Sequence, residues 1–451
     1  MVFSSLIFLF RFLPIALLLL FLTPKKYQNL LLFALSLLFY AWGEVRYIFI
    51  MFFSVVLDYS TSNLIEKNRD HPWFPKAMLM TSVVGNVGML FFFKYMGFVG
   101  SIFSLDLPVL TLPLGISFYT FQTMSYTIDV YRQKVKAETN IIDFGAFVCL
   151  FPQLIAGPIV KYSQIAHELK HRVMSLQSFE SGLKIFLLGL SSKVLLANNI
   201  GMMWDDIQKI PVSQLSTVTA WLGTAAFGFQ IYFDFSGYSL MAIGLGAMLG
   251  FSFPQNFNYP YISKSMTEFW NRWHMTLGSW FKEYVYIPLG GNRKGILRQI
   301  INLLIVWFLT GFWHGAAFNF ILWGLYFFGL LVIEKIWLYR WLNQHPIASR
   351  MYFVFFILIG WVIFAISDLQ LLAQYLSAMF SLQSSTQWIY FISNYGVILL
   401  FCLIFSTDIP KKIVNSVTFP MVEASMITVL FLFCIAYLVD SSYNPFLYFR
   451  F

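Results

Sequence analysis

The sequence predicts an all-α polytopic membrane protein of about 11–12 transmembrane helices, with further re-entrant or amphipathic helices. Of its 451 residues, 59% are hydrophobic and 11% are charged, whereas a soluble domain usually has about 25% charged residues. The hydrophobic residues form runs long enough to cross a bilayer, and most Lys and Arg residues lie between these runs. These features exclude a water-soluble enzyme of this length.

A membrane-spanning helix requires about 20 mostly apolar residues, and the chain contains a series of segments near this length. Several segments are shorter, so some helices are expected to end inside the bundle. The first is not expected to be a cleavable signal peptide, because Arg11 interrupts it and no small-residue cleavage site follows. The predicted spans are residues 5–22, 29–43, 47–64, 77–93, 113–131, 184–201, 217–245, 299–313, 320–335, 351–367, 388–407 and 422–440.

The positions of the cations predict which side of the membrane each linker faces. Most of the 29 Lys and Arg residues lie in alternate linkers, and such linkers are retained on the cytoplasmic side. Both termini are therefore expected on the outer side of the membrane. The net charge of +9 is explained by this orientation, and nucleic-acid binding is excluded because no soluble basic module is present. The cations expected on the outer side are Arg46, Lys94, Lys209 and Arg450.

Two segments are predicted to enter and leave the membrane on the cytoplasmic side. Residues 141–160 contain FPQLIAGPI, whose Pro and Gly residues break a helix; such backbone is tolerated at membrane depth only inside protein or beside water. Residues 269–291 are too polar to span and are expected to form one amphipathic or re-entrant helix that ends at Pro288, Gly290 and Gly291. The alternative is that one of these segments spans the bilayer and another boundary is wrong.

Few groups are available for metal or thiol chemistry. Cys149, Cys402 and Cys434 lie in apolar runs and are expected to be buried core residues. The sequence has no HExxH, P-loop or dinucleotide motif. His274 and His314 alone would leave a catalytic zinc short of its usual three protein ligands. No metal and no tightly bound cofactor is therefore expected.

Ionisable residues within apolar segments are the candidate functional groups, because burying them in a membrane is costly unless they are paired or hydrated. His314 lies where two apolar helices join, and the alternative role for it is a neutral imidazole bonded to a neighbouring helix. His274 lies among Trp and Arg residues, which an amphipathic surface helix would also carry. Asp234 is expected to pair with Lys193 or Arg272.

A second carboxylate, Glu334, lies at the end of a predicted span. It is expected to meet Lys335 and the membrane interface. Of the remaining groups, only imidazole has a pKa suited to general-base catalysis near neutral pH. A buried histidine could therefore activate a hydroxyl group towards an acyl thioester.

Several long motifs carry a resemblance to a known family, and they occur in that family's order over most of the chain. The motifs are FPQLIAGPIV (151–160), FQIYFDFSGYSLMAIG (229–244), FWNRWHMTLGSWFKEYVYIPLGGNRKG (269–295), LTGFWHGAAFNFILWG (309–324) and YNPFLYFRF (443–451). They make the chain similar to the membrane-bound O-acyltransferases, and within these to the bacterial alginate and peptidoglycan O-acetylation branch. The chain departs from the branch at Leu240, Gly246 and Ala247, so roles of the charged residues usual there do not carry over.

The resemblance implies one membrane-embedded domain over residues 1–451, shaped as a funnel through which acyl groups cross the membrane. Its catalytic core would be about 113–335, followed by an extracytoplasmic tail at 441–451. His314 matches the principal catalytic histidine of the family, and His274 matches its second polar position. The expected supporting or tunnel-lining residues are Asp234, Asn271, Arg272, Trp313 and Asn319.

The resemblance further implies that acetyl-CoA, a cytoplasmic thioester, is the donor for O-acetylation of a cell-envelope polysaccharide. Peptidoglycan is favoured by the compact length, with alginate and other exopolysaccharides as alternatives. An extracytoplasmic polysaccharide O-acetyltransferase is expected as partner, because the outer linkers near 94–112, 202–216 and 368–387 are too short to hold a glycan. The competing functions are D-alanyl transfer to teichoic acid and transport without covalent chemistry.

The aromatic tail suggests one more acyl carrier. Tyr448 either anchors the chain end in the aromatic belt of the membrane interface or, as proposed for relatives with similar tails, accepts the acyl group as an ester. A phenol of pKa about 10 needs a base to attack a thioester, and His314 would serve if the tail folds back.

Overall fold

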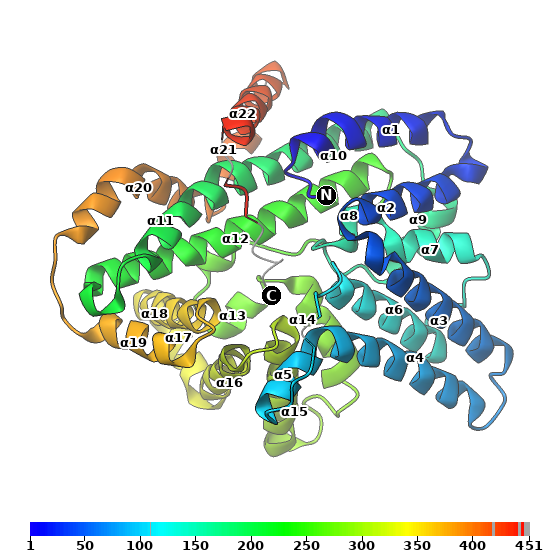
Figure 1. Cartoon of the computed structure of the whole chain (residues 1–451), viewed down its shortest axis with the longest axis horizontal. Helices are drawn as coiled ribbons and strands as arrows, with labels where there is room; N and C mark the ends of the chain where they lie inside the picture. The colour runs from blue at the N-terminus through cyan, green and yellow to red at the C-terminus, as the bar shows by residue number, and fades with distance from the viewer. Residues whose placement is uncertain (109, 417–419, 441–442, 446–451) are drawn as a thin grey trace. The chain divides into compact units, whose positions relative to one another are not determined.

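A computed structural model describes residues 1–108, 110–416, 420–440 and 443–445 (Figure 1). Every regular element in these ranges is helical and none is a strand, which confirms the all-α prediction. The chain divides into two compact units. The first comprises Met1–Leu187 and Tyr238–Pro254, and the second comprises Leu188–Gly237 and Gln255–Phe451.

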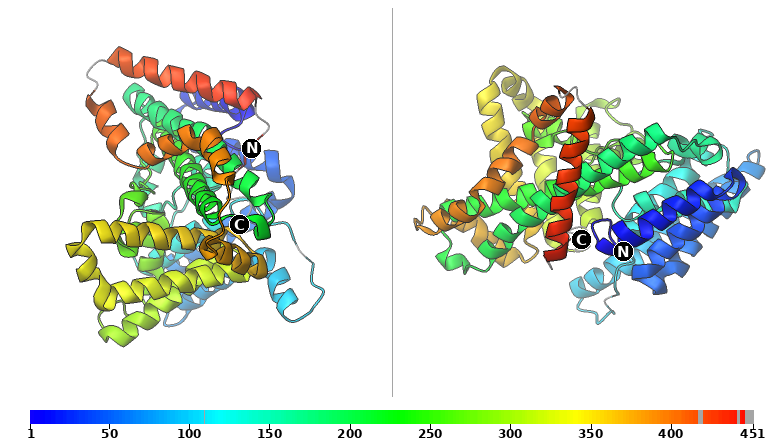
Figure 2. Two further views of the ribbon diagram at one scale, coloured as in Figure 1. Left: turned by 90° about the vertical axis from the view of Figure 1, so that its left-hand side faces the viewer. Right: turned by 90° about the horizontal axis from the view of Figure 1, so that it is seen from above.

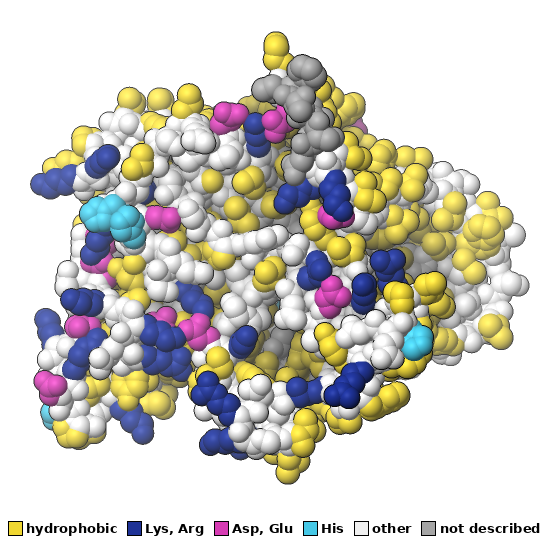
Figure 3. Space-filling view, turned by 180° about the vertical axis from the view of Figure 1, so that it is seen from behind, with side chains coloured by type: hydrophobic (Ala, Val, Ile, Leu, Met, Phe, Trp, Pro, Cys, Tyr) yellow, Lys and Arg dark blue, Asp and Glu magenta, His cyan; other side chains and the backbone are white. Residues whose placement is uncertain are grey.

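The surface and the helix lengths confirm a polytopic membrane protein. Eight helical runs in the described residues are long and apolar enough to cross a membrane, and one of them, Lys25–Lys67, contains two of the predicted spans. The apolar helix Phe8–Leu22 is shorter. Large side chains such as Leu22 and Phe49 are exposed, and Figure 3 shows hydrophobic side chains at the surface together with many Lys and Arg side chains. Exposed apolar side chains on long helices suit a lipid solvent, because a helix satisfies its own backbone hydrogen bonds within the segment.

The first unit contains the amino-terminal helices and is tied together by polar contacts between its spans. The fully buried carboxylate of Asp58 accepts hydrogen bonds from Ser82, from Asn86 at 2.8 Å and from Thr127 at 3.0 Å. Its elements are η1 Phe8–Phe12, α1 Leu13–Leu22, η2 Lys25–Tyr27, α2 Gln28–Glu44, η3 Val45–Tyr47, α3 Ile48–Lys67, α4 Phe74–Leu90, η4 Phe91–Tyr95, α5 Met96–Ile102, α6 Ile116–Tyr131, α7 Ile141–Cys149, α8 Phe151–Leu154, α9 Tyr162–His171 and most of α10 Leu176–Ser191.

The break predicted within residues 141–160 is confirmed. Helix α7 begins after Asn140, whose side chain caps it, and ends before Leu150, while the short α8 starts at the FPQL sequence. Proline at the second position of α8 cannot continue the preceding hydrogen-bond ladder, which explains why the helix is interrupted here. The three cysteines are buried and unbridged, as expected.

The second unit contains the candidate catalytic residues and most of α12. Within this unit, helix α22 packs against the π-helical turn η5 (Figure 2). Its elements are η5 Ser192–Ala197, α11 Asn198–Gln208, η6 Val212–Gln214, α12 Thr217–Met248, η7 Pro260–Ile262, α13 Met266–Trp270, α14 Met275–Phe281, η8 Lys282–Tyr286, α15 Gly295–His314, α16 Phe318–Ile333, η9 Glu334–Leu338, α17 Tyr339–Gln344, α18 Pro346–Ala365, α19 Leu369–Phe380, α20 Gln387–Phe405, α21 Ile409–Ser416 and α22 Pro420–Asp440.

The three segments predicted as outer linkers are partly helical. Helix α5 lies within 94–112, α11 extends to Gln208, and α19 occupies most of 368–387. Helix α19 buries Leu372, Tyr375 and Met379, a spacing that places one apolar stripe on one face. It is too short and too amphipathic to be recognised as a span.

Candidate active site

His314 is positioned by a tightly packed pair of helices, α15 and α16. A Cβ atom on Gly311 would lie 2.3 Å from the carbonyl oxygen of Phe320, and one on Gly324 would lie 2.4 Å from that of Trp307. Only glycine at these two positions allows such a close approach. His314 is the last residue of α15 and is only 7% exposed, so the rigid pair fixes the imidazole at a helix end inside the protein.

Aromatic rings surround the His314 imidazole. Its ring centroid lies 4.9 Å from Trp313, 5.0 Å from Trp323 and 5.3 Å from Phe364, all in edge-on geometry. These rings enclose the imidazole and place no fixed charge of their own beside it. Trp313, predicted as a supporting residue, therefore forms one wall of the site.

His274 lies at a sharp break that the sequence did not reveal. Residues 269–291 do not form one helix as predicted: α13 ends at Trp270, α14 begins at Met275, and the helical segment closes with η8 at Tyr286. His274 stands at the break with φ +42°, a left-handed conformation that is unusual for a residue with a side chain. It is 2% exposed, so its role as part of an amphipathic surface helix is also wrong.

A buried asparagine fixes the orientation of the His274 ring. The Asn256 side-chain oxygen lies 3.0 Å from His274 Nδ1 and also accepts hydrogen bonds from the backbone N–H and the hydroxyl of Thr276. Because that oxygen can only accept, Nδ1 carries the proton in the neutral ring and Nε2 has the lone pair. Burial lowers the pKa of His274, which keeps the ring neutral at pH 7.

The two histidines both lie close to Trp313. The His274 and Trp313 ring centroids are 6.1 Å apart, and the Trp313 ring in turn contacts His314. Phe235 on α12 meets His274 edge-on at 4.8 Å. The structure thus brings together the two residues that the sequence selected as catalytic candidates.

The intramembrane carboxylate Asp234 forms an ion pair with Lys193, one of its two predicted partners. The Lys193 Nζ to Asp234 Oδ1 distance is 2.7 Å, and neither side chain is more than 2% exposed. Arg272, the other candidate, instead pairs with Glu268 at 2.9 Å and donates to the Asn258 carbonyl oxygen. Arg272 therefore stabilises the α13 turn before His274 and has no ion pair with Asp234.

A cavity of about 440 Å³ reaches His274 from one side. Tryptophan and aliphatic side chains form most of its lining, with Asn271, Ser279, Lys282 and Tyr286 as polar groups. Thr310, one turn before His314 on α15, also lines it. A cavity with apolar walls and a few converging polar groups is suited to a small-molecule acyl donor.

The remaining predicted residues have separate positions. The Asn319 amide donates to the carbonyl oxygens of Ile363 and Phe364, both at 3.1 Å, and so holds the end of α18 against α16. Tyr448 and Arg450 lie outside the described residues.

Glu334 has a different role from the one expected. It is fully buried, and its carboxylate accepts hydrogen bonds from the backbone N–H groups of Met266 at 2.6 Å and Thr267 at 2.8 Å and from the Thr267 hydroxyl. These N–H groups have no partner within α13, because they belong to its first turn. Glu334 therefore caps α13 and fixes the segment that leads to His274.

We expect Glu334→Ala to lower the free energy of unfolding by about 3 kcal/mol, because it leaves two buried N–H groups without an acceptor. Glu334→Gln retains one acceptor oxygen and should lose less. Thermal unfolding of the purified protein in detergent measures both. Equal stability of Glu334→Ala and the unchanged protein would contradict the capping role.

Sequence reasoning missed Asn256, Trp323 and the capping function of Glu334. Asn256 lies in a loop remote from His274 in sequence, and only the folded chain brings the two together. Trp323 lies in an apolar span where a tryptophan is unremarkable. Its presence one residue before Gly324, in the motif that also holds His314, was the available signal.

The region that resembles known proteins includes both candidate histidines. The sequence pattern of the membrane-bound O-acyltransferase family matches residues 131–373. The chain is 41% identical over 392 residues to a probable alginate O-acetylase of Azotobacter vinelandii, covering 84% of this chain and 78% of that protein. It is 34% identical to the peptidoglycan O-acetyltransferase of Helicobacter pylori, covering 85% and 80%. A teichoic acid D-alanyltransferase of Streptococcus thermophilus is 32% identical, but covers 50% of this chain and 57% of that protein.

Proposed function

This chain belongs to the membrane-bound O-acyltransferase family, and on that premise we propose that it moves acetyl groups from cytoplasmic acetyl-CoA across the bacterial inner membrane for O-acetylation of a cell-envelope polysaccharide. The observation that carries the proposal is the pair of buried histidines beside Trp313, one of which lines a cavity of about 440 Å³. The proposed orientation places the cavity on the cytoplasmic side and both termini outside.

In the proposed reaction, His314 takes the proton from an acceptor hydroxyl while the hydroxyl oxygen attacks the thioester carbonyl. The carbon–sulfur bond then breaks, and the sulfur leaves as the CoA thiol with that proton. The products are an O-acetyl ester and free CoA. His274, with its Nε2 lone pair held in place by Asn256, orients the reacting groups at the cavity.

The donor is tested by incubating purified protein with radiolabelled acetyl-CoA and measuring free CoA. We expect release that is lost in His314→Ala and kept in His345→Ala. His345 is a matched control, because it is an exposed histidine stacked on Trp341. Release that is equal in all three proteins would argue against the proposal. Loss of D-alanine from a D-alanyl carrier protein, with no release of CoA from acetyl-CoA, would instead support D-alanyl transfer.

Two polysaccharide classes are candidates for the acceptor. The 41% identity to an alginate O-acetylase, against 34% to a peptidoglycan O-acetyltransferase, supports an exopolysaccharide of the alginate kind. The 34% identity over most of the peptidoglycan O-acetyltransferase supports peptidoglycan as the other candidate. Deleting the gene and measuring ester-linked acetate separately on each polymer distinguishes them, since acetate should disappear from one and persist on the other.

We propose that Tyr448 accepts the acetyl group as an ester and passes it to an extracytoplasmic partner transferase. We expect Tyr448→Phe to lose polymer acetylation, because phenylalanine has no oxygen to carry the ester. Mass spectrometry of the carboxy-terminal peptide should show an added acetyl group only in the chain that retains Tyr448. Unchanged polymer acetylation in Tyr448→Phe would exclude an obligatory tyrosyl ester.

A further inference from the structure

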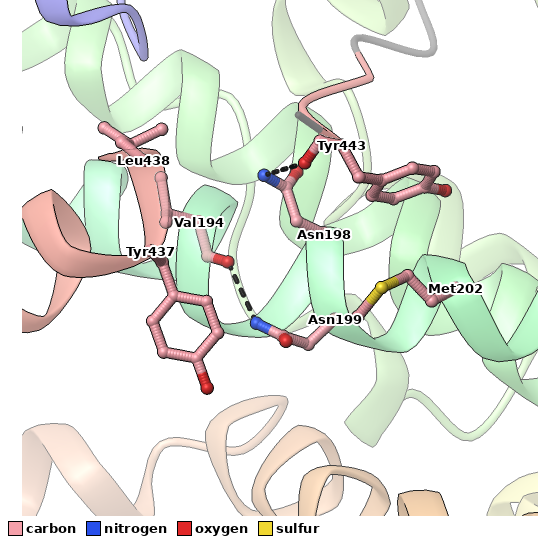
Figure 4. Close-up of a pocket in the computed structure, with 7 residues that line it drawn as sticks. All are labelled: Val194, Asn198, Asn199, Met202, Tyr437, Leu438 and Tyr443. Atoms are coloured by element: carbon pink, nitrogen blue, oxygen red, sulfur yellow. Dashed lines mark hydrogen bonds between the residues drawn. The ribbon is translucent and has the colours of Figure 1, made fainter. Parts of the chain in front are cut away.

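The last described residues of the chain, Tyr443–Pro445, are held by three polar side chains of η5 and α11. The Asn198 amide donates to the Tyr443 carbonyl oxygen at 3.4 Å (Figure 4) and to the Asn444 side-chain oxygen at 3.3 Å. The Tyr443 hydroxyl donates to Asp205 at 2.6 Å. Lys193 donates to the Pro445 carbonyl oxygen, so each of the three residues has its own contact.

The same face of α11 is shaped for the Tyr443 ring. A Cβ atom on Gly201 would lie 3.1 Å from the Tyr443 phenol oxygen and 2.3 Å from the amide nitrogen of Gln230. Asn198, Gly201 and Asp205 follow one another at intervals of three and four residues, which places them on one side of a helix. The contacts to Tyr443 therefore form one continuous surface.

This surface is connected to the histidine site through a short series of contacts. Lys193 holds Pro445 and is also paired with Asp234 on α12. The residue after Asp234 is Phe235, whose ring meets His274 at 4.8 Å. The segment is thus linked to His274 through Lys193, Asp234 and Phe235.

We propose that Lys193, Asn198, Gly201 and Asp205 form a docking site for residues 443–445 of this chain, and that this docking is required for delivery of the acyl group. The delivery role rests on the proposed function; the docking site itself does not. Three residue steps separate Pro445 from Tyr448, so covalent geometry limits their Cα atoms to a separation of about 11 Å. Docking raises the effective concentration of the terminal residues at the site.

Docking can be measured without activity, by trimming the full-length protein with carboxypeptidase and following its intact mass. Asp205→Asn and Tyr443→Phe each weaken the same hydrogen bond to a charged group. We expect either change to speed removal of residues 443–445 about tenfold, and the double variant to add little to the single ones. Asp206→Asn is the matched control, because the neighbouring carboxylate of Asp206 accepts hydrogen bonds from Lys209 and Tyr395 instead of from Tyr443.

The delivery role predicts that the two docking variants lower the rate of polymer acetylation about tenfold and leave the KM for acetyl-CoA unchanged. Unchanged trimming in both variants would overturn the docking site. Faster trimming with a normal acetylation rate would overturn the delivery role. A protein that shows no CoA release but does show the trimming differences would refute the proposed function and leave the docking site standing. Thermal unfolding identifies any variant that fails to fold, and Asn198→Leu then replaces it.

Discussion

Replacing His314 by alanine is expected to reduce acetyl transfer by about 10²- to 10⁴-fold, the usual contribution of a positioned general base. The imidazole is the last side chain of α15 and is enclosed by Trp313, Trp323 and Phe364, so no water-exposed group can take its place. The measurement is ester-linked acetate on the polymer in cells, together with CoA release from purified protein.

A glutamine at position 314 separates hydrogen bonding from basicity, because its amide resembles the imidazole in polarity but cannot take a proton at neutral pH. We expect His314→Gln to be as inactive as the alanine variant, with membrane insertion and unfolding temperature close to those of the unchanged protein. Substantial activity in His314→Gln would show that His314 positions the reactants and that the base is another group.

The fold class could be predicted because the requirement for about 20 apolar residues per span is set by the bilayer and not by tertiary contacts. Segments 299–313 and 388–407 therefore agree closely with α15 and α20. Helix α19 was missed because its length and polarity suit a surface connection as well as a helix. Local hydrophobicity could not decide between these.

The candidate residues of the site could be chosen from the sequence, but only part of their arrangement in space could be predicted. His274 and His314 stand out because an imidazole inside an apolar chain is costly, and the family assignment and enzyme class, an O-acetyltransferase, are confirmed by the comparisons. The break at His274 depends on Asn256, a contact that no local pattern encodes. The choice of Lys193 over Arg272 as the partner of Asp234 likewise depends on which helices meet in the folded chain.

The Lys193–Asp234 pair should have the largest effect on stability. Removing one member of a buried ion pair leaves an uncompensated charge, so we expect Asp234→Ala to lower the free energy of unfolding by about 3–5 kcal/mol. The double variant Lys193→Met with Asp234→Leu removes both charges and keeps apolar volume, and should recover most of that loss. Chemical unfolding of the purified protein in lipid nanodiscs measures both variants. A singly substituted protein as stable as the unchanged one would mean that water reaches the pair.

The double variant also separates two roles of Lys193, because it restores packing without restoring the ammonium group that holds the Pro445 carbonyl oxygen. If the ion pair serves stability alone, the double variant should resist carboxypeptidase as well as the unchanged protein does. We expect instead that it folds normally and is trimmed quickly at residues 443–445. Apolar side chains would stabilise these helices at a lower desolvation cost than an ion pair does. The presence of the Lys193 charge is therefore best explained by its hydrogen bond to the Pro445 carbonyl oxygen.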